Sequence, residues 1–183
     1  MAREATMDIQ KELNSSQTIL LLMKGSDYSK SSIDIVKKLR GGSICYVTLN
    51  RTSDSLRELI KKNKVNVKNI VFIDAITKTL KASPNQADGV LFVESPAALT
   101  EISLAISKLL AHGFQYLLFD SITNLLIYQQ KAPVALFVSN IVNKVRQSKT
   151  KAVFYALQSG EQQALIEECG MFVDKVINLG KKK

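Results

Sequence analysis

The stretch TILLLMKGSDYSKSSIDIVKKL (18–39) contains the pattern from which the fold of the whole chain can be predicted. Residues 18–23 form a continuous apolar run, which is typical of a strand buried on both faces of a parallel sheet. Ile33, Val36 and Leu39 then follow one another at helical spacing. The stretch therefore predicts a strand, a polar turn and a helix.

Strand-like and helix-like segments alternate along the rest of the chain. The expected strands are 43–49, 69–74, 90–95, 115–121, 152–157 and 172–179. The expected helices are 52–64, 96–113, 133–149 and 161–170. Pro96 is expected in the first turn of its helix, where a missing N–H is harmless.

This alternation predicts parallel crossovers, because a helix between two strands returns the chain to the same end of the sheet. We therefore expect a single α/β domain over 1–183, built as a three-layer α/β/α sandwich around a mostly parallel sheet. A polar segment (1–16) precedes the first strand, and a basic tail (180–183) ends the chain.

The composition is that of an ordinary globular protein. Hydrophobic residues make up 46% and charged residues 22%, which excludes a disordered chain. No apolar run reaches the ~20 residues that cross a bilayer, and the start of the chain has no signal-peptide core. We therefore expect a cytoplasmic protein without a transmembrane segment. Cys45 and Cys169 form no CxxC pattern and are expected to be buried thiols, and His112 is expected at a helix end, before Gly113.

The net charge of +9 leaves two interpretations open. Basic residues gather in LIKKNKVNVK (59–68) and in the tail GKKK (180–183). An excess of positive charge attracts nucleic acid or an anionic surface. Lysines also form ordinary solvated faces, and neither stretch has the interleaved aromatic residues of a single-strand binder. Nucleic-acid binding is therefore a hypothesis that stands beside a solvated face.

A degenerate phosphate-binding loop is the first candidate site. Such a loop has the form G-x-x-x-x-G-K-[ST]: its backbone N–H groups cradle phosphates, its lysine reaches the terminal phosphates and its hydroxyl binds Mg²⁺. Residues 24–31 read KGSDYSKS, so Lys30 and Ser31 match the last two positions. Lys24 and Ser29 stand where the glycines belong.

These departures work against phosphate binding. Ser29 places a side chain against the phosphate and adds strain of ~1–3 kcal/mol if its φ is positive. Asp27 places a negative charge beside a negative ligand, a repulsion of ~4 kcal/mol at ~4 Å for an effective dielectric of about 20. Tyr28 is bulky where small residues usually allow close approach. A plain strand, turn and helix explains the stretch equally well.

Asp120, at the end of the apolar segment QYLLF, is the second candidate. An acidic residue at the end of a neighbouring strand completes the metal site of a phosphate-binding loop. The same residue would serve equally well as the N-cap of a helix over 121–128. VFIDAITKTL (71–80) is similar to LLFDSITNLL (117–126), and we interpret this as similar local structure and not as a repeat.

Taken together, these segments resemble the RecA/KaiC-like branch of the P-loop ATPases over nearly the whole chain. YLLFDSITNLL (116–126), with its aspartate–serine pair, resembles the second acidic motif of that family and is the most specific match. The resemblance implies ATP and Mg²⁺ as ligands, with Lys30 at the phosphates and with Ser31 and Asp120 at the metal. A chain that binds no cofactor is an equal alternative.

The same resemblance argues against hydrolysis. In the family a catalytic carboxylate follows the second strand, where it orients the attacking water. The corresponding stretch here is VTLNRTS (47–53), with Asn50 and Arg51. Neither an asparagine nor an arginine takes a proton from water at neutral pH. With both the phosphate cradle and the base altered, the sequence predicts an inactive member, a pseudoenzyme without catalytic residues.

Three functions follow from these observations. The first is a non-catalytic RecA/KaiC-like domain that acts through protein–protein association, either with itself or with a protein partner. The second is an Mg-ATP-binding protein with weak or no hydrolysis. The third is a basic, recombinase-like protein that binds nucleic acid.

Overall fold

The computed structural model describes residues 7–82 and 84–180; most of the predicted basic tail lies outside this part of the chain. The strands are β1 (Thr18–Met23), β2 (Ile44–Thr48), β3 (Ile70–Asp74), β4 (Val90–Phe92), β5 (Tyr116–Asp120), β6 (Lys151–Leu157) and β7 (Lys175–Asn178). The α-helices are α1 (Ile9–Ser15), α2 (Tyr28–Leu39), α3 (Ser53–Lys62), α4 (Thr77–Leu80), α5 (Leu99–Ala111), α6 (Lys131–Arg146) and α7 (Gln163–Gly170). Three short 3-10 helices lie in connections: Gly25–Asp27, Ile122–Ile127 and Gly160–Gln162.

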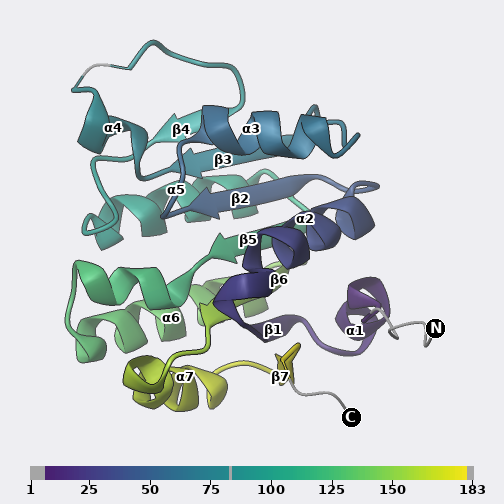
Figure 1. Cartoon of the computed structure of the whole chain (residues 1–183), viewed down its shortest axis with the longest axis vertical. Coiled ribbons are helices and arrows are strands. Elements are labelled where there is room, and N and C mark those ends of the chain that lie inside the picture. The colour runs from purple at the N-terminus through teal and green to yellow at the C-terminus, as the bar shows by residue number, and fades with distance from the viewer. Residues whose placement is uncertain (1–6, 83, 181–183) are drawn as a thin grey trace.

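The strands form one sheet in the order β4-β3-β2-β5-β6-β1-β7, which crosses the molecule in Figure 1. Every neighbouring pair in this sheet is parallel, so the prediction of a mostly parallel sheet is confirmed. Parallel strands need crossovers, which the helices supply. β1 lies between β6 and β7, while β2 lies between β3 and β5. Strands that are neighbours in the sheet are therefore not always neighbours in the sequence.

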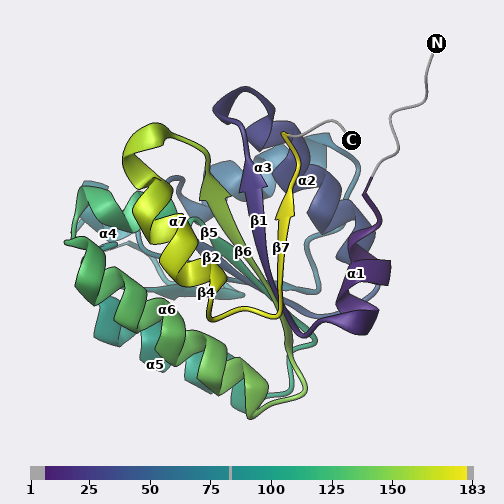
Figure 2. The same ribbon diagram turned by 90° about the horizontal axis from the view of Figure 1, so that it is seen from below.

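Helices cover both faces of the sheet and complete the predicted three layers. Figure 2 shows α1, α2 and α3 on one side of the strands and α5, α6 and α7 on the other. Each helical layer has its own apolar core: Leu56 and Val36 belong to one, Ile106 and Val142 to the other. The strands between are buried on both faces, because a parallel sheet covered by helices presents side chains to two cores.

The structure corrects two of the predicted boundaries. The helix expected from Pro96 begins at Leu99, because Ser95 closes a turn with its carbonyl bonded to the N–H of Ala98 over 3.0 Å. The segment expected to be polar (1–16) contains α1, which buries Ile9 and Leu13 in the core.

Other local predictions are confirmed. Cys45 and Cys169 are free and buried. His112 is the C-cap of α5, and Gly113 follows it with a φ of +75°, a left-handed conformation that glycine adopts without strain. Within the described residues, no helix has both the length and the apolar character needed to cross a membrane.

Candidate functional site

The carboxyl ends of the parallel strands share one edge of the sheet, and the connections that follow β1, β2, β5 and β6 begin there. In open parallel sheets, ligands bind beyond this edge. Asp120 is the last residue of β5 and lies opposite Thr48 of β2 in register. Asp120 is 2% exposed, so its environment is set by the side chains packed around it.

The connection after β1 is a tight turn. Only residues 24–27 separate β1 from α2, and Gly25–Asp27 form one 3-10 turn. The backbone N–H of Asp27 donates to the carbonyl of Lys24 over 3.1 Å. A phosphate cradle needs successive N–H groups that point at the ligand. This turn has four residues, and one of its N–H groups is used within it.

The carboxylate of Asp120 is bound by side chains from two neighbouring elements. The Tyr28 hydroxyl, in the first turn of α2, donates to Oδ1, and the Tyr46 hydroxyl of β2 donates to Oδ2 over 2.6 Å. The Asn50 amide, just after β2, lies 3.5 Å from Oδ1 and donates to the Tyr28 oxygen over 2.6 Å. Both carboxylate oxygens are therefore occupied by hydrogen bonds within the chain.

Two polar atoms near this cluster have no hydrogen-bond partner among the described residues. The Tyr155 hydroxyl is fully buried on β6, and the Oδ1 atom of Asn50 is also buried. Buried polar atoms without partners are rare in folded proteins and mark sites worth attention. The cluster is therefore buried around Asp120, Tyr46 and Tyr155 and half-buried at Tyr28 and Asn50, and its hydrogen bonds are not all satisfied.

Burial dominates the electrostatics of the cluster. Burial raises the pKa of Asp120 from 3.8 to about 6, although hydrogen bonds from Tyr28 and Tyr46 and the charge of Arg51 oppose the rise. Burial, together with the nearby Asp120 carboxylate, also raises the pKa of Tyr46 and of Tyr155 well above the ordinary value. The tyrosines therefore stay neutral, and Tyr28 and Tyr46 donate their hydroxyl protons to Asp120.

Comparisons with known proteins bear on the fold. No protein-family model matches the sequence, and neither does any curated protein. Among solved structures, a KaiC-like protein from the hyperthermophilic archaeon Pyrococcus horikoshii OT3 matches with a TM-score of 0.58 and 13% identity, covering 91% of this chain and 73% of that one. An ATPase of the type III secretion system of pathogenic bacteria matches with a TM-score of 0.56 and 12% identity, covering 90% of this chain and 51% of that one.

The chain has the RecA-like P-loop ATPase fold. The predicted fold class is thereby confirmed. At 12–13% identity the likeness establishes the fold, and function rests on this chain's own residues.

Within this RecA-like fold, the three predicted ligand residues divide into two groups. Asp120 lies with Tyr28 and with Asn50, the residue that stands where the family has its catalytic carboxylate. Lys30 and Ser31 lie in the first turn of α2, where Lys30 is exposed and Ser31 is half-buried. Among the described residues, no side-chain hydrogen bond joins Lys30 or Ser31 to Asp120, so their role as ATP and Mg²⁺ ligands stays a prediction.

The donor set around Asp120 does not suit Mg²⁺ in this arrangement. Mg²⁺ requires oxygen ligands in near-octahedral geometry and usually takes its protein ligands from carboxylates. Here each oxygen of the Asp120 carboxylate accepts a hydrogen bond from a tyrosine hydroxyl. The Arg51 guanidinium points to Ser29, whose Oγ accepts over 3.0 Å.

The alternative role of Asp120 as a helix N-cap is wrong. The segment after it is a 3-10 helix (Ile122–Ile127) that receives no side-chain cap. The peptide bond between Asp120 and Ser121 is cis. The carboxylate faces α2 and β2, where the tyrosine hydroxyls meet it.

Sequence reasoning missed two members of the cluster. Tyr46 and Tyr155 lie inside strands that read as apolar core, and no motif distinguishes them. Tyr28 could be singled out in the sequence, because it is a bulky residue at a position where a phosphate-binding loop has small ones. Its contact with Asp120 could not be predicted without the path of the turn.

Proposed function

We propose that this chain is a non-catalytic RecA/KaiC-like domain that acts through protein–protein association. The observation that supports the absence of catalysis is the capture of Asp120 by Tyr28 and Tyr46. In P-loop ATPases an aspartate at the end of a neighbouring strand serves the metal ion. Here the carboxylate binds hydroxyl groups of its own chain.

The residues after β2 support the same conclusion. Asn50 donates its amide to Tyr28, and an amide does not accept a proton at neutral pH. Arg51 is bound to Ser29 and is a permanent cation. Neither residue deprotonates a water molecule, so the segment lacks a general base beside the closed carboxylate.

An apolar groove between α5 and α6 supports association. It has a volume of about 300 Å³. Leu104 and Leu136 lie in it and are 63% and 65% exposed. The other residues that line it are Leu99, Thr100, Ser103, Pro133, Phe137 and Asn140. Apolar side chains that stay exposed together along a groove are typical of interaction sites.

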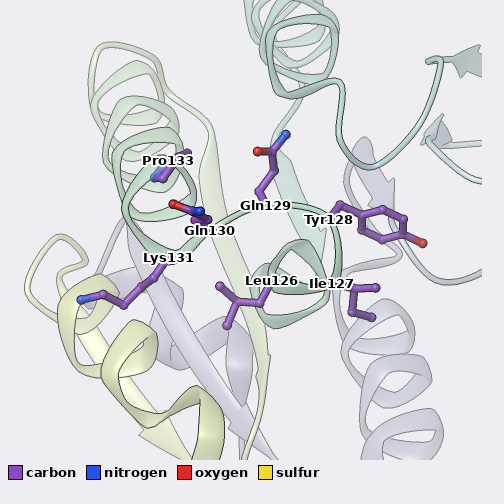
Figure 3. A pocket seen from close by; sticks show the side chains of 7 residues that line it. All are labelled: Leu126, Ile127, Tyr128, Gln129, Gln130, Lys131 and Pro133. Atoms are coloured by element: carbon purple, nitrogen blue, oxygen red, sulfur yellow. The ribbon is translucent and has the colours of Figure 1, made fainter.

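A second hollow adjoins this groove, because Pro133 lines both. Figure 3 shows its lining, which comes from one continuous segment between the 3-10 helix and the start of α6. Ile127 is 73% exposed and Tyr128 44% exposed in this segment. The amide of Gln129 donates to the carbonyl of Ala97 over 3.1 Å and ties the segment to the start of α5.

The occupant that we propose for this surface is a second copy of the chain. Copies with a net charge of +9 repel one another, and an uncharged contact face keeps this repulsion smallest because it brings no like charges close together. The groove is lined by uncharged residues alone. Nearby cations are used within the chain: Lys144 donates to the hydroxyls of Ser103 and Ser107 over 2.8 and 2.7 Å, and Lys131 pairs with Glu168 over 2.8 Å. Two such faces related by a two-fold axis bring leucines together without opposing charges.

Sedimentation equilibrium over a wide concentration range tests this proposal. We expect the chain to form a dimer and the Leu136→Asp variant to be a monomer, because the new carboxylate would be buried without a partner. The matched control is Leu80→Asp, which changes a leucine that is 74% exposed on α4 and should leave the dimer intact. A monomeric wild-type chain, or an assembly that grows beyond two copies, would contradict the proposal.

A separate assay tests the absence of catalysis. Purified chain should release no phosphate from Mg-ATP above the rate without protein. Steady release that stops in a Lys30→Ala variant would overturn this part of the proposal, whatever the oligomeric state.

A further inference from the structure

The amino ends of the strands form the edge of the sheet opposite to the candidate site. The connections that reach β3, β2, β5 and β6 at this edge carry positive charge without negative charge, whereas Asp88 and Asp174 lie in the connections to the outer strands β4 and β7. Four crossover helices end there, and the connections that follow them are RGGS (40–43), NKVNVKN (63–69), HGFQ (112–115) and QSKT (147–150). These four described connections hold Arg40, Lys64, Lys68 and Lys149 and contain neither aspartate nor glutamate.

Hydrogen bonds join these connections into one continuous row. The N–H of Ile44 donates to the carbonyl of Asn69 over 2.8 Å, which places the second connection beside the first. The side chain of Gln115 accepts from the N–H of Ser43 over 3.1 Å, and its carbonyl accepts from the N–H of Lys151 over 2.9 Å. The row therefore runs across four neighbouring strands, a width of ~15 Å at the usual strand spacing.

The cations of this row are exposed and free of ion pairs. The exposed cations of the four connections and of the last turn of α3 are Arg40, Lys61, Lys62, Lys64, Lys68 and Lys149. We call this set of six residues the basic edge. None of them takes part in the ion pairs of the described residues. In Figure 1 the connections lie on the side away from the arrowheads of β2 and β3.

The helix dipole explains only part of this charge. Helices favour lysine in their last turn, which accounts for Lys61 and Lys62. It does not account for Lys68 and Lys149, which lie beyond the helices. The bias is specific to these four connections, because those at the opposite edge together hold two cations and three anions: Lys24, Arg51, Asp27, Glu94 and Glu161.

We propose that the basic edge binds the phosphate backbone of a nucleic acid. Cations spaced along a row match a ligand whose negative charges repeat along a chain. Asn66 and Asn69 are exposed between the lysines and add neutral donors of the kind that contact phosphate and sugar. An anionic membrane is the less fitting partner, since peripheral binding to a bilayer adds apolar anchors and none of the exposed large apolar side chains of the described residues lies in these four connections.

The test is binding of a labelled DNA duplex, a labelled single-stranded RNA and phosphatidylserine vesicles to the full chain at several salt concentrations. We expect nucleic acid to bind, with the logarithm of affinity falling against the logarithm of salt with a slope of roughly −3 to −5 for the duplex, as for three to five phosphate contacts. The double variant Arg40→Glu/Lys68→Glu should bind roughly tenfold more weakly and flatten the slope by about two.

The matched control is Lys24→Glu/Lys81→Glu, which makes the same change in charge with exposed residues outside the basic edge. It should keep the affinity and the slope of the wild-type chain. An Arg40→Ala/Lys68→Ala variant removes the two charges without reversing them and should lose less affinity, so it guards against misfolding caused by the reversed charges. Circular dichroism checks that each variant is folded.

Three results would overturn the proposal: no binding of nucleic acid at low salt, equal losses in the edge variant and its control, or tighter binding to vesicles than to nucleic acid. Leu136→Asp, which tests association through the α5/α6 groove, should still bind nucleic acid. The failure of one proposal can therefore be distinguished from the failure of the other.

Discussion

Asp74 and Asp120 end the two strands on either side of β2, and both lie opposite Thr48 in register. Both are buried, and both are followed by similar sequences. Their titration nevertheless differs in direction. Burial would raise the pKa of Asp74, but hydrogen bonds outweigh it and hold the pKa below its ordinary value. Burial raises the pKa of Asp120 to about 6.

The donors around Asp74 belong mainly to the backbone. Its carboxylate accepts from the N–H groups of Ser53, Ile76 and Thr77 over 2.6, 2.8 and 2.8 Å, and from the Thr77 hydroxyl over 2.6 Å. Together these donors stabilise the ionised form, the Thr77 hydroxyl most and the backbone N–H groups of Ser53 and Thr77 next. Asp74 therefore holds the start of α3 and the start of α4 to the end of β3.

The donors around Asp120 are side-chain hydroxyls and an amide. Burial is the largest influence on this carboxyl, and the hydrogen bonds oppose it without outweighing it, so the pKa remains high. The contrast teaches that the balance between burial and hydrogen bonds, and not the position at a strand end, decides how a buried aspartate titrates.

Loss of the Asp74 carboxylate should have the largest effect. Asp74→Ala leaves three backbone N–H groups without their acceptor, at about 1–3 kcal/mol for each buried one. We expect the free energy of unfolding to fall by roughly 3–5 kcal/mol, as measured by urea denaturation. A loss below about 1 kcal/mol would show that these N–H groups find water or other partners.

The next largest effect should be a change of the free energy of unfolding with pH, which has opposite signs at the two aspartates. Because the folded-state pKa of Asp120 is about 6, the native state binds this proton more tightly than the unfolded chain does. The free energy of unfolding should therefore fall as the pH rises from about 4 to about 6. Asp120→Asn removes this titration, so its free energy of unfolding should gain on that of the wild type by roughly 2–3 kcal/mol between pH 4 and pH 8.

Asp74→Asn is the matched comparison for this experiment. The lowered pKa of Asp74 stabilises the fold above its unfolded-state value of 3.8, and this contribution is lost as the pH falls through the folded-state pKa. Urea denaturation between pH 3 and pH 8 should show the two variants diverging from the wild type in opposite directions. Parallel curves for the wild type and both variants would remove the contrast.

Removal of one hydroxyl should have a moderate effect. Tyr28→Phe deletes a donor to Asp120 and an acceptor for Asn50, and it should lower the free energy of unfolding by roughly 1–2 kcal/mol at pH 7. It should also move the inflection of the stability curve to higher pH, because Asp120 loses a group that stabilises its charge. An unchanged inflection would mean that the Tyr28 hydroxyl does not act on Asp120.

The smallest expected effect concerns nucleotide. Addition of millimolar Mg-ATP should leave the melting temperature of the chain and of Lys30→Ala unchanged, because a ligand that does not bind the native state does not stabilise it. A rise in the wild type that is absent in Lys30→Ala would instead support an Mg-ATP-binding protein. It would assign to Lys30 the role that its position in the sequence predicts.

The fold could be predicted because its signal is local. Apolar runs and helical spacing identify the segments, and alternation alone requires parallel crossovers. α1 was not predicted, because a helix of seven residues with two buried side chains is too short for its hydrophobic period to be detected. The start of α5 was placed too early, because Ser95 uses the residues around Pro96 for a turn.

The site could be predicted only in part. The positions of Asp120 and Asn50 follow from their place at strand ends. The contact between Tyr46 and Asp120 depends on register, because Tyr46 pairs with Leu118 and so lies on the same face as a residue two positions further on. A sequence states neither the register nor the path of a four-residue turn, and Tyr28 depends on that path.

Tyr28 and Asp120 are 92 positions apart in the chain, and their contact fastens the beginning of α2 to the middle of the sheet. Loops that admit ligands come from the least stable parts of a protein, where opening requires little free energy. In this chain the turn after β1 is joined to a buried strand through this contact. We therefore expect the turn to open less readily than a loop without such an attachment.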